Sequence, residues 1–385
     1  VPNLSDVRTL AKILEGLGVP SEWGKDGSLH LEVRSEKNVT APYELVRTMR
    51  ASFCVLGPLL AKRGEARVSH PGGCVFGVRP IDLHVKGLKA LGAKISVEHG
   101  YVVAKAKKLR GAHIYLGGSS GSTVLGTAQV MSAACLAQGV TIIENAACEP
   151  EVVDLGHLLN AMGAKISGIG SPQMVIEGVS RLKGATYKII PDRIEAGTLI
   201  MAGLITGGKV EVENVVPAHL AAVLDKIAEV GAKITEGSDS LKAEMKGVIK
   251  AVDVTTLPYP GFPTDLQAQM TALLSLADGI SVVTERIYPD RFMHVSELAR
   301  LGAHIRKEGS SAVIEGVRRL SGAPIMASDL RASASLVLAG LAADGKTDVH
   351  RIYHLDRGYE HLEKKLAALG ARIWREKDTG SLGGG

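Results

Sequence analysis

The sequence is poor in aromatic residues and has no long hydrophobic run. Phe, Trp and Tyr make up only 4% of its 385 residues, so any core must be mostly aliphatic. Hydrophobic residues reach 45% and charged residues 22%, which is ordinary for a globular protein. No stretch of about 20 consecutive apolar residues predicts a membrane-spanning helix. We therefore expect a globular protein with no membrane partner.

Cysteines are also scarce, and they lack the spacing of a metal site or a disulfide framework. The four are Cys54, Cys74, Cys135 and Cys148, and they include no CxxC pair. Such usage is typical of a reducing compartment. We expect a cytoplasmic protein that uses no metal and no other cofactor.

Three common catalytic signatures are missing from the sequence. It contains no GxxxxGK[ST] loop, no GxGxxG after a strand and no HExxH, so nucleotide hydrolysis, dinucleotide binding and zinc proteolysis are not indicated. The net charge is +5, and the basic residues are scattered rather than grouped. This favours local anion sites and argues against a nucleic-acid partner.

What the sequence does contain is an internal repeat. A tag that reads LGA, or nearly so, recurs six times at a spacing of roughly 70 residues, beginning at Leu17, Leu91, Met162, Val230, Leu301 and Leu369. Before each tag lies an amphipathic helical pattern, such as residues 216–230. The tag glycine suits the position just after a helix end, and two short strands are expected after it. Each copy is therefore a small α/β subdomain.

A second type of helix alternates with the first and is apolar nearly all round, which predicts burial. Its five copies are residues 48–64, 122–139, 192–208, 263–279 and 329–345. Their first turns carry polar or charged residues, namely Arg50, Ser122, Thr123, Arg193, Glu195, Asp265 and Arg331. Helix caps would explain a serine or an aspartate. They do not explain repeated arginines, which favour helix N-termini that converge on an anionic ligand.

Six tags but only five buried helices leave the first repeat incomplete. We expect about 40 residues to precede Val1 in the full protein. Three repeats in each half predict two domains, residues 1–190 and residues 191–380, with the boundary near a proline and a charge cluster at 188–197.

One glycine-rich loop, residues 69–84, carries a cysteine that invites two interpretations. Cys74 lies among Pro71, Gly72, Gly73 and Gly77, where continuous helix or strand is improbable. A thiol in such a loop near Arg79 could have a lowered pKa and be reactive. It could equally be a small hydrophobic residue buried in a tight turn.

Other residues that could take part in catalysis or binding also have ordinary structural explanations. Asp265 could be an N-cap. Arg291, Asp329 and Arg357 each lie near residues of opposite charge in the sequence and could form surface ion pairs. The Gly/Ser turn at 118–123 suits a phosphate but has low specificity. Residues alone therefore indicate a two-domain α/β protein with an arginine-lined anionic cleft.

Eight sequence blocks carry a family resemblance that spans nearly the whole chain. They are APYELVRTMRAS (41–52), PGGCVFGVRPIDLH (71–84), IIENAACEPEVVDL (142–155), PDRIEAGT (191–198), FPTDLQAQ (262–269), DRFMHVSELARLGA (290–303), DLRASASLVLAG (329–340) and RIYHLDRGYE (351–360). In this order they resemble the enolpyruvyl transferases, and among these the family that acts on UDP-N-acetylglucosamine. The resemblance implies a two-domain inside-out α/β barrel of six βαβαββ repeats.

The family reaction moves the enolpyruvyl group of phosphoenolpyruvate to the 3′-hydroxyl of UDP-N-acetylglucosamine, the first committed step of peptidoglycan synthesis. The resemblance implies that Cys74 is the general acid and the residue that fosfomycin alkylates, and that Asp265 takes the hydroxyl proton. Arg79, Arg331 and Arg357 match the arginines around phosphoenolpyruvate, and Arg357 is also expected to take part in catalysis. The implied sugar-nucleotide contacts are Arg50, Arg79, Pro80, Ile81, Asp82, Leu83, Gly121, Ser122, Thr123, Val124, Asp265 and Ile287. Arg291, Arg193 and Asp329 are expected elsewhere in the cleft.

Two rival functions stay open at this point. The shikimate-pathway carboxyvinyltransferase shares the fold and phosphoenolpyruvate, although PGGC and HLDRGYE favour the sugar-nucleotide enzyme. A catalytically silent homologue that binds the sugar nucleotide is the other. The family's Lys-Asn pair would fall in the segment expected before Val1, so full activity of the chain as it stands is not expected. We expect a monomer whose partners are small-molecule substrates.

Overall fold

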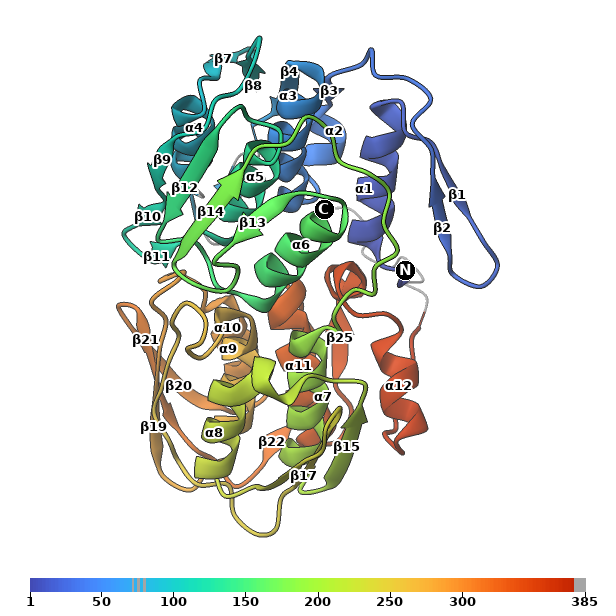
Figure 1. Ribbon diagram of the computed structural model, residues 1–385. Helices are drawn as coiled ribbons and strands as arrows, with labels where there is room; N and C mark the ends of the chain where they lie inside the picture. The colour runs from blue at the N-terminus through green and yellow to red at the C-terminus, as the bar shows by residue number, and fades with distance from the viewer. Residues whose placement is uncertain (71–72, 75–76, 79–80, 377–385) are drawn as a thin grey trace.

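The protein folds into two lobes that lie one above the other, the first blue to green and the second yellow to red (Figure 1). The computed structural model describes residues 1–376 except 71–72, 75–76 and 79–80; for 73–74 and 77–78 it describes the backbone alone. One hydrophobic core runs from Ile13 to Ile176 and a second from Ile194 to Leu366. Residues 178–192, all described, contain no helix or strand. The domain boundary between residues 190 and 191 stays a prediction.

The first lobe contains two four-stranded sheets of the same design. One has the order β3-β4-β8-β7 and the other β9-β12-β14-β13, and in each the first pair is parallel and the other two are antiparallel. Their strands are β3 (Thr40–Ala41), β4 (Glu65–Ser69), β7 (Lys94–Glu98), β8 (Tyr101–Lys105), β9 (His113–Tyr115), β12 (Val140–Glu144), β13 (Lys165–Ser167) and β14 (Gln173–Glu177). Short hairpins pair β1 (Ser21–Trp23) with β2 (Leu29–Leu31), β5 (Gly73–Cys74) with β6 (Gly77–Val78), and β10 (Gly117–Gly118) with β11 (Gly121–Ser122).

Helices of the first lobe lie between these strands along the chain. They are α1 (Ser5–Gly16), α2 (Tyr43–Val46), η1 (Arg50–Val55), α3 (Leu56–Arg63), α4 (Asp82–Ala90), α5 (Val124–Ala134) and α6 (Pro150–Ala161). The predicted βαβαββ unit is therefore present twice in this lobe, from β3 to β8 and from β9 to β14. The stretch before β3 contains only α1 and the β1–β2 hairpin, in agreement with an incomplete first repeat.

In the second lobe, a third complete unit forms the sheet β18-β19-β21-β20. Its members are β18 (Val254–Thr255), η3 (Thr264–Leu266), α9 (Gln267–Leu274), β19 (Ile280–Thr284), α10 (Met293–Arg300), β20 (His304–Glu308) and β21 (Ser311–Glu315). Before it lie α7 (Arg193–Ile205), β15 (Lys209–Glu213), η2 (Pro217–Leu220), α8 (Ala221–Glu229), β16 (Lys233–Glu236) and β17 (Ser240–Glu244). After it lie β22 (Leu320–Ser321), β23 (Pro324–Met326), α11 (Leu330–Ala342), β24 (Ala343–Asp344), β25 (Asp348–His350), η4 (Ile352–Arg357) and α12 (Leu362–Ala368).

The two predicted helix types are both present. Every tag glycine follows an amphipathic helix and has a positive φ, between +84° and +101°, in Gly18, Gly92, Gly163, Gly231, Gly302 and Gly370. The apolar helices α7, α9 and α11 pack against one another inside the second lobe. All eight residues of α9 are buried, which confirms the burial that its apolar sequence predicts.

Three of the five predicted buried helices are wrong in their first turns. Ser122, expected in one of them, lies in β11, and α5 begins at Val124 after its N-cap Thr123. Residues 50–55 form the 3₁₀ helix η1, and the α-helix begins only at Leu56. Pro58 explains the change, because proline lacks an N–H donor and is tolerated in the first turn of an α-helix. Residues 264–266 likewise form the 3₁₀ helix η3 before α9. Within the described ranges, no helix is long and apolar enough to cross a membrane.

Candidate active site

The side chains of greatest chemical interest meet at the start of α9. Asp265 lies in η3, and its carboxylate accepts hydrogen bonds from two arginines on different elements. Arg291 Nη1 lies 2.6 Å from Asp265 Oδ1, and Arg331 Nη2 lies 3.0 Å from Oδ2. Arg291 also donates to Thr264 Oγ1 at 2.9 Å. Three residues that are far apart in the sequence therefore form one charged cluster.

Asp265 is not a helix cap. No side-chain cap bond is made at the start of η3 or of α9. Burial on its own would raise the pKa of this carboxyl, but the guanidinium groups of Arg331 and Arg291 outweigh burial and hold the pKa below its ordinary value. The carboxylate is therefore fully ionised at neutral pH and a weak base while both arginines contact it.

Asp329 and Arg193, expected in the cleft, have defined structural partners. Asp329 is the N-cap of α11, where its carboxylate accepts from the backbone N–H groups of Arg331 and Ala332. Arg193 begins α7, and its Nε donates to Glu151 of α6 in the other lobe at 2.9 Å. Arg331 and Arg193, at the N-termini of buried helices, are thus paired with protein carboxylates in this structure.

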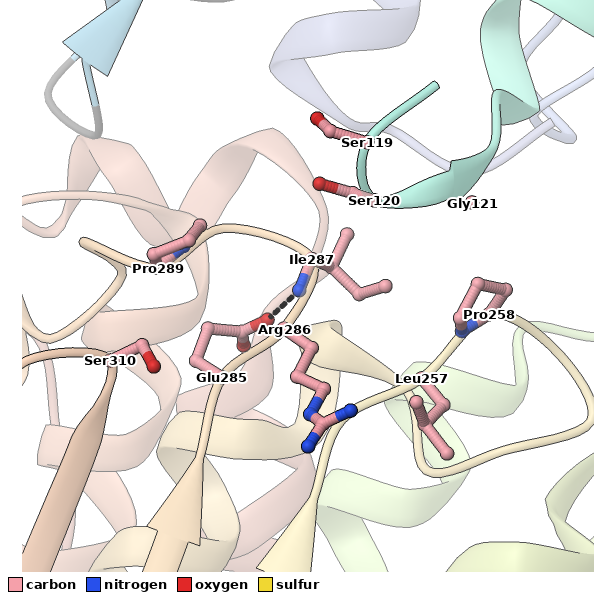
Figure 2. A pocket seen from close by; sticks show the side chains of 10 residues that line it. All are labelled: Ser119, Ser120, Gly121, Leu257, Pro258, Glu285, Arg286, Ile287, Pro289 and Ser310. Carbon is pink, nitrogen blue, oxygen red and sulfur yellow. Dashed lines mark hydrogen bonds between the residues drawn. The ribbon is translucent and has the colours of Figure 1, made fainter. Parts of the chain in front are cut away.

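A cavity of about 470 Å³ opens between the lobes. Figure 2 shows it between the β10–β11 turn of the first lobe and segments of the second lobe at 257–258, 285–289 and Ser310. The residues that line it are Ser119, Ser120, Gly121, Leu257, Pro258, Glu285, Arg286, Ile287, Pro289 and Ser310. Two predicted sugar-nucleotide contacts, Gly121 and Ile287, therefore line one cavity from opposite sides.

Glu285 holds the second-lobe side of this cavity in shape. Its buried carboxylate accepts from the backbone N–H groups of Ile287 and Tyr288 at 2.8 and 3.0 Å. It also accepts from the hydroxyls of Thr256 and Thr264 at 2.6 and 2.8 Å. Because Thr264 adjoins Asp265, one carboxylate links the cavity wall to the charged cluster.

The two lobes touch beside the cavity. A Cβ placed on Gly121, whose φ is +96°, would lie 2.9 Å from Pro258 Cγ. The next residue, Tyr259, donates its backbone N–H to the buried carboxylate of Glu149 at 3.3 Å. The ring centroid of Tyr259 lies 5.7 Å from Arg193 Cζ. The loop at residues 257–261 is thus one part of the second lobe that fits against the first.

The remaining predicted contacts are distributed around the first lobe. Thr123 caps α5 through a hydrogen bond from Gly126 N, with Ser122 and Val124 beside it. Ile81 is buried, Asp82 is exposed in the first turn of α4, and Leu83 lies 3.2 Å from a Cβ placed on Gly118. Arg50 is the first residue of η1 and is partly buried.

Arg357 lies at the end of η4 and has a carboxylate partner of its own. Its Nε and Nη2 donate to the two carboxylate oxygens of Asp6 in α1, at 3.0 and 3.2 Å. This ion pair joins the second lobe to the N-terminal helix. The structure records no contact between Arg357 and Asp265.

Three predictions fall outside what the structure describes. Arg79 and Pro80 lie outside the described residues, and so does the side chain of Cys74, whose backbone pairs with Gly77. The other three cysteines are free thiols, and burial raises the pKa of Cys54 and of Cys135 to about 11. Burial also raises the pKa of Cys148. None of these three is suited to act as a thiolate.

Comparison with known proteins places this geometry in a family. A model of EPSP synthase (3-phosphoshikimate 1-carboxyvinyltransferase) matches residues 1–366. UDP-N-acetylglucosamine 1-carboxyvinyltransferase of Methylacidiphilum infernorum is 54% identical over 375 residues, which cover 97% of this chain and 89% of that protein. The protein of the same name from an Anaeromyxobacter species is 55% identical over 381 residues, covering 98% and 90%.

The chain belongs to the UDP-N-acetylglucosamine 1-carboxyvinyltransferases within the EPSP synthase family.

Solved structures confirm the expected fold of this family. The enolpyruvyl transferase NikO from Streptomyces tendae superposes with a TM-score of 0.87 at 24% identity, covering 97% of this chain and 88% of that one. EPSP synthase from Acinetobacter baumannii gives a TM-score of 0.70 at 17% identity, covering 95% and 88%. The prediction of an enolpyruvyl transferase fold is therefore confirmed.

Sequence reasoning missed two buried groups in this member of the UDP-N-acetylglucosamine 1-carboxyvinyltransferases. Glu285 holds the cavity wall, and its signal was a charged residue directly after the apolar strand β19. Tyr359 lies inside the RGYE block and is only 1% exposed. Its hydroxyl contacts Arg331 at 3.3 Å. Within the described ranges, no group of three or more His, Cys, Asp or Glu residues is placed to hold a metal ion.

Proposed function

We propose that this protein transfers the enolpyruvyl group of phosphoenolpyruvate to the 3′-hydroxyl of UDP-N-acetylglucosamine and releases phosphate, as a step of peptidoglycan synthesis. The observation that carries the proposal is the identity of 53–55% to four proteins of that activity, over 97–98% of the chain. The charged cluster at Asp265 and the cavity between the lobes agree with one small anionic substrate and one larger substrate.

The reaction is an addition followed by an elimination. In the addition, the 3′-oxygen bonds to C2 of phosphoenolpyruvate, the hydroxyl proton goes to Asp265, and a proton from Cys74 is added to C3. In the elimination, C3 loses a proton and the C2–O bond to phosphate breaks, which restores the double bond. Arg331, Arg357 and Arg79 hold the phosphate and carboxylate of phosphoenolpyruvate, since guanidinium forks match both groups.

In this proposal, the contact between Asp265 and Arg331 makes the basicity of Asp265 depend on whether phosphoenolpyruvate is already bound. While Arg331 contacts Asp265, the low pKa of the carboxyl makes it a poor proton acceptor. An incoming phosphate competes for the same guanidinium group. Once Arg331 turns to phosphoenolpyruvate, the pKa of Asp265 rises and the carboxylate becomes a better base. Arg291 stays on the other oxygen and keeps the carboxylate oriented.

The sugar nucleotide occupies the other part of the cleft in this proposal. Its contacts are Arg50, Arg79, Pro80, Ile81, Asp82, Leu83, Gly121, Ser122, Thr123, Val124, Asp265 and Ile287. Arg193 stabilises the cleft through its ion pair with Glu151, and Asp329 stabilises it by capping α11. We further propose a cytoplasmic monomer that supports cell shape and division, with Cys74 as the residue that fosfomycin alkylates.

Release of inorganic phosphate from phosphoenolpyruvate tests the proposal. The rate is measured without acceptor, with UDP-N-acetylglucosamine and with shikimate 3-phosphate, for the wild type and for Cys74→Ala. The expected result is release that depends on UDP-N-acetylglucosamine and is impaired in Cys74→Ala. Release with shikimate 3-phosphate alone would favour the activity named by the matching family model. Sugar-nucleotide binding without release would favour a silent homologue.

A further inference from the structure

The core of the second lobe contains a polar cluster that ends at Arg331. Tyr359, Thr198 and Gln269 are each at most 1% exposed, and they come from three different parts of the chain. The hydroxyl of Tyr359 lies 2.9 Å from Thr198 Oγ1, 3.2 Å from Gln269 Nε2 and 3.3 Å from Arg331 Nη1. Polar groups this deep in an aliphatic core carry a desolvation cost that only well-formed hydrogen bonds offset.

The hydrogen-bond directions in this cluster follow from its partners. Thr198 donates its single hydroxyl proton to the backbone carbonyl of Ile194 at 2.8 Å. Thr198 Oγ1 therefore accepts a hydrogen bond from Tyr359, which donates its one hydroxyl proton there. The Tyr359 oxygen is left to accept from Arg331 and from Gln269. Gln269 Nε2 also lies 3.1 Å from Thr198 Oγ1, so the two hydroxyl oxygens share its donor.

This arrangement holds one end of the guanidinium group. Arg331 Nη1 is bound to Tyr359, and the Tyr359 ring centroid lies 5.6 Å from Arg331 Cζ. The other end, Nη2, is bound to Asp265. Asp265 comes from the cleft side and keeps 38% of its side chain exposed, whereas Tyr359 is enclosed. A substrate anion can displace the contact with Asp265 but not the contact with Tyr359.

We propose that Tyr359 is a positioning residue for Arg331, with Thr198 and Gln269 fixing the orientation of its hydroxyl. The inference rests on the proposed function, because it assigns Arg331 to phosphoenolpyruvate. Tyr359 keeps the guanidinium group in place while Nη2 passes from Asp265 to the substrate. Preorganised donors of this kind bind an anion without first having to be ordered.

The test compares Tyr359→Phe with Tyr187→Phe, which also removes a phenolic hydroxyl, but one that donates to Asp154 Oδ1 on α6 at 2.7 Å instead of contacting Arg331. Two readouts are used: the KM for each substrate, and the rise in unfolding temperature that phosphoenolpyruvate alone produces. We expect Tyr359→Phe to raise the KM for phosphoenolpyruvate about tenfold and to reduce the temperature rise. The KM for UDP-N-acetylglucosamine should change less than twofold, and Tyr187→Phe should behave as the wild type.

Thr198→Val serves if Tyr359→Phe does not fold, because it keeps Tyr359 and Arg331 and removes only the hydroxyl that orients them. It should raise the KM for phosphoenolpyruvate about threefold. Equal changes in both KM values, or no change, would overturn the inference while sugar-dependent turnover of the wild type still supports the proposed function. A wild type that phosphoenolpyruvate does not stabilise would overturn the inference as well. A wild type that phosphoenolpyruvate stabilises but that shows no turnover would count against the proposed function alone.

Discussion

The cleft has two parts that differ in charge and in enclosure. The cluster around Asp265 joins one carboxylate to two guanidinium groups, and both arginine side chains are at most 12% exposed. The cavity in Figure 2 is lined mainly by small and apolar side chains and by backbone, and its arginine, Arg286, is exposed. Buried fixed charges suit a small anion whose charge changes during reaction. An open and largely neutral wall suits a larger substrate held by shape.

This contrast has a physical basis in the fold. The cluster stands at the ends of buried helices within one lobe, where packing holds each side chain in one position. The cavity lies between lobes, where the wall consists of turns that meet at Gly121 and Pro258. Changes in the first part should therefore act on phosphoenolpyruvate and on chemistry, and changes in the second on the sugar nucleotide.

The largest effect is expected from Asp265→Asn. This change removes the proposed proton acceptor and leaves Arg291 and Arg331 facing an uncharged amide. We expect kcat to fall by about 100-fold or more, the range found for loss of a general base. The kcat is measured as the rate of phosphate release at saturating substrates. The control is Asp239→Asn, a change at an exposed residue. A kcat within threefold of the wild type would remove Asp265 from the chemistry.

Arg331→Lys should have the next largest effect. Lysine keeps the charge but cannot contact both Asp265 and Tyr359 as the guanidinium fork does. We expect the KM for phosphoenolpyruvate to rise about tenfold or more, and the KM for UDP-N-acetylglucosamine to change less than twofold. Steady-state kinetics with each substrate varied in turn provide the measurement. A larger effect on the sugar nucleotide would reverse the assignment of the two parts.

Gly121→Ala addresses the neutral part of the cleft, and Gly139→Ala is its matched control. Both glycines have a positive φ, +96° and +89°, so each change should cost about 1 kcal/mol of backbone strain. Only at Gly121 does the new Cβ meet the other lobe, 2.9 Å from Pro258 Cγ. We expect the KM for UDP-N-acetylglucosamine to rise about threefold for Gly121→Ala alone. Similar kinetics for both variants would show that this contact does not shape the cavity.

The last prediction concerns stability beside the charged part and not catalysis. His294 is 2% exposed, its Nε2 has no hydrogen-bond partner among the described residues, and burial lowers its pKa from 6.5 to about 4. Between these pH values the unfolded chain binds the proton more tightly than the folded one. The free energy of unfolding should therefore fall as the pH drops from about 6.5 to about 4, by about 3 kcal/mol in total.

His294→Gln removes this titration. When the pH is lowered from 7.5 to 5, the unfolding temperature of the wild type should therefore fall more than that of the variant. Parallel changes of the two proteins over that interval would show that His294 is not the group responsible.

Some features followed from the sequence alone because they depend on local or periodic properties. Apolar residues spaced for a helix, followed by glycine, predicted all six tag helices and their ends, since only glycine takes a positive φ at low cost. The eight sequence blocks predicted the family. The repeat length predicted small α/β subdomains, and the family resemblance implied the βαβαββ unit, which the described residues contain in full three times.

Tertiary structure alone decided which charged residues meet. Asp265 looked like a helix cap, yet Arg291 and Arg331, 26 and 66 residues further on, take its carboxylate instead. Tyr359 lies in a sequence block rich in charged residues, yet it closes a buried network with Thr198, 161 residues away. A sequence pattern records the period of a helix but not its neighbours. Only when α7, α9 and α11 pack together do their polar residues come within hydrogen-bond distance.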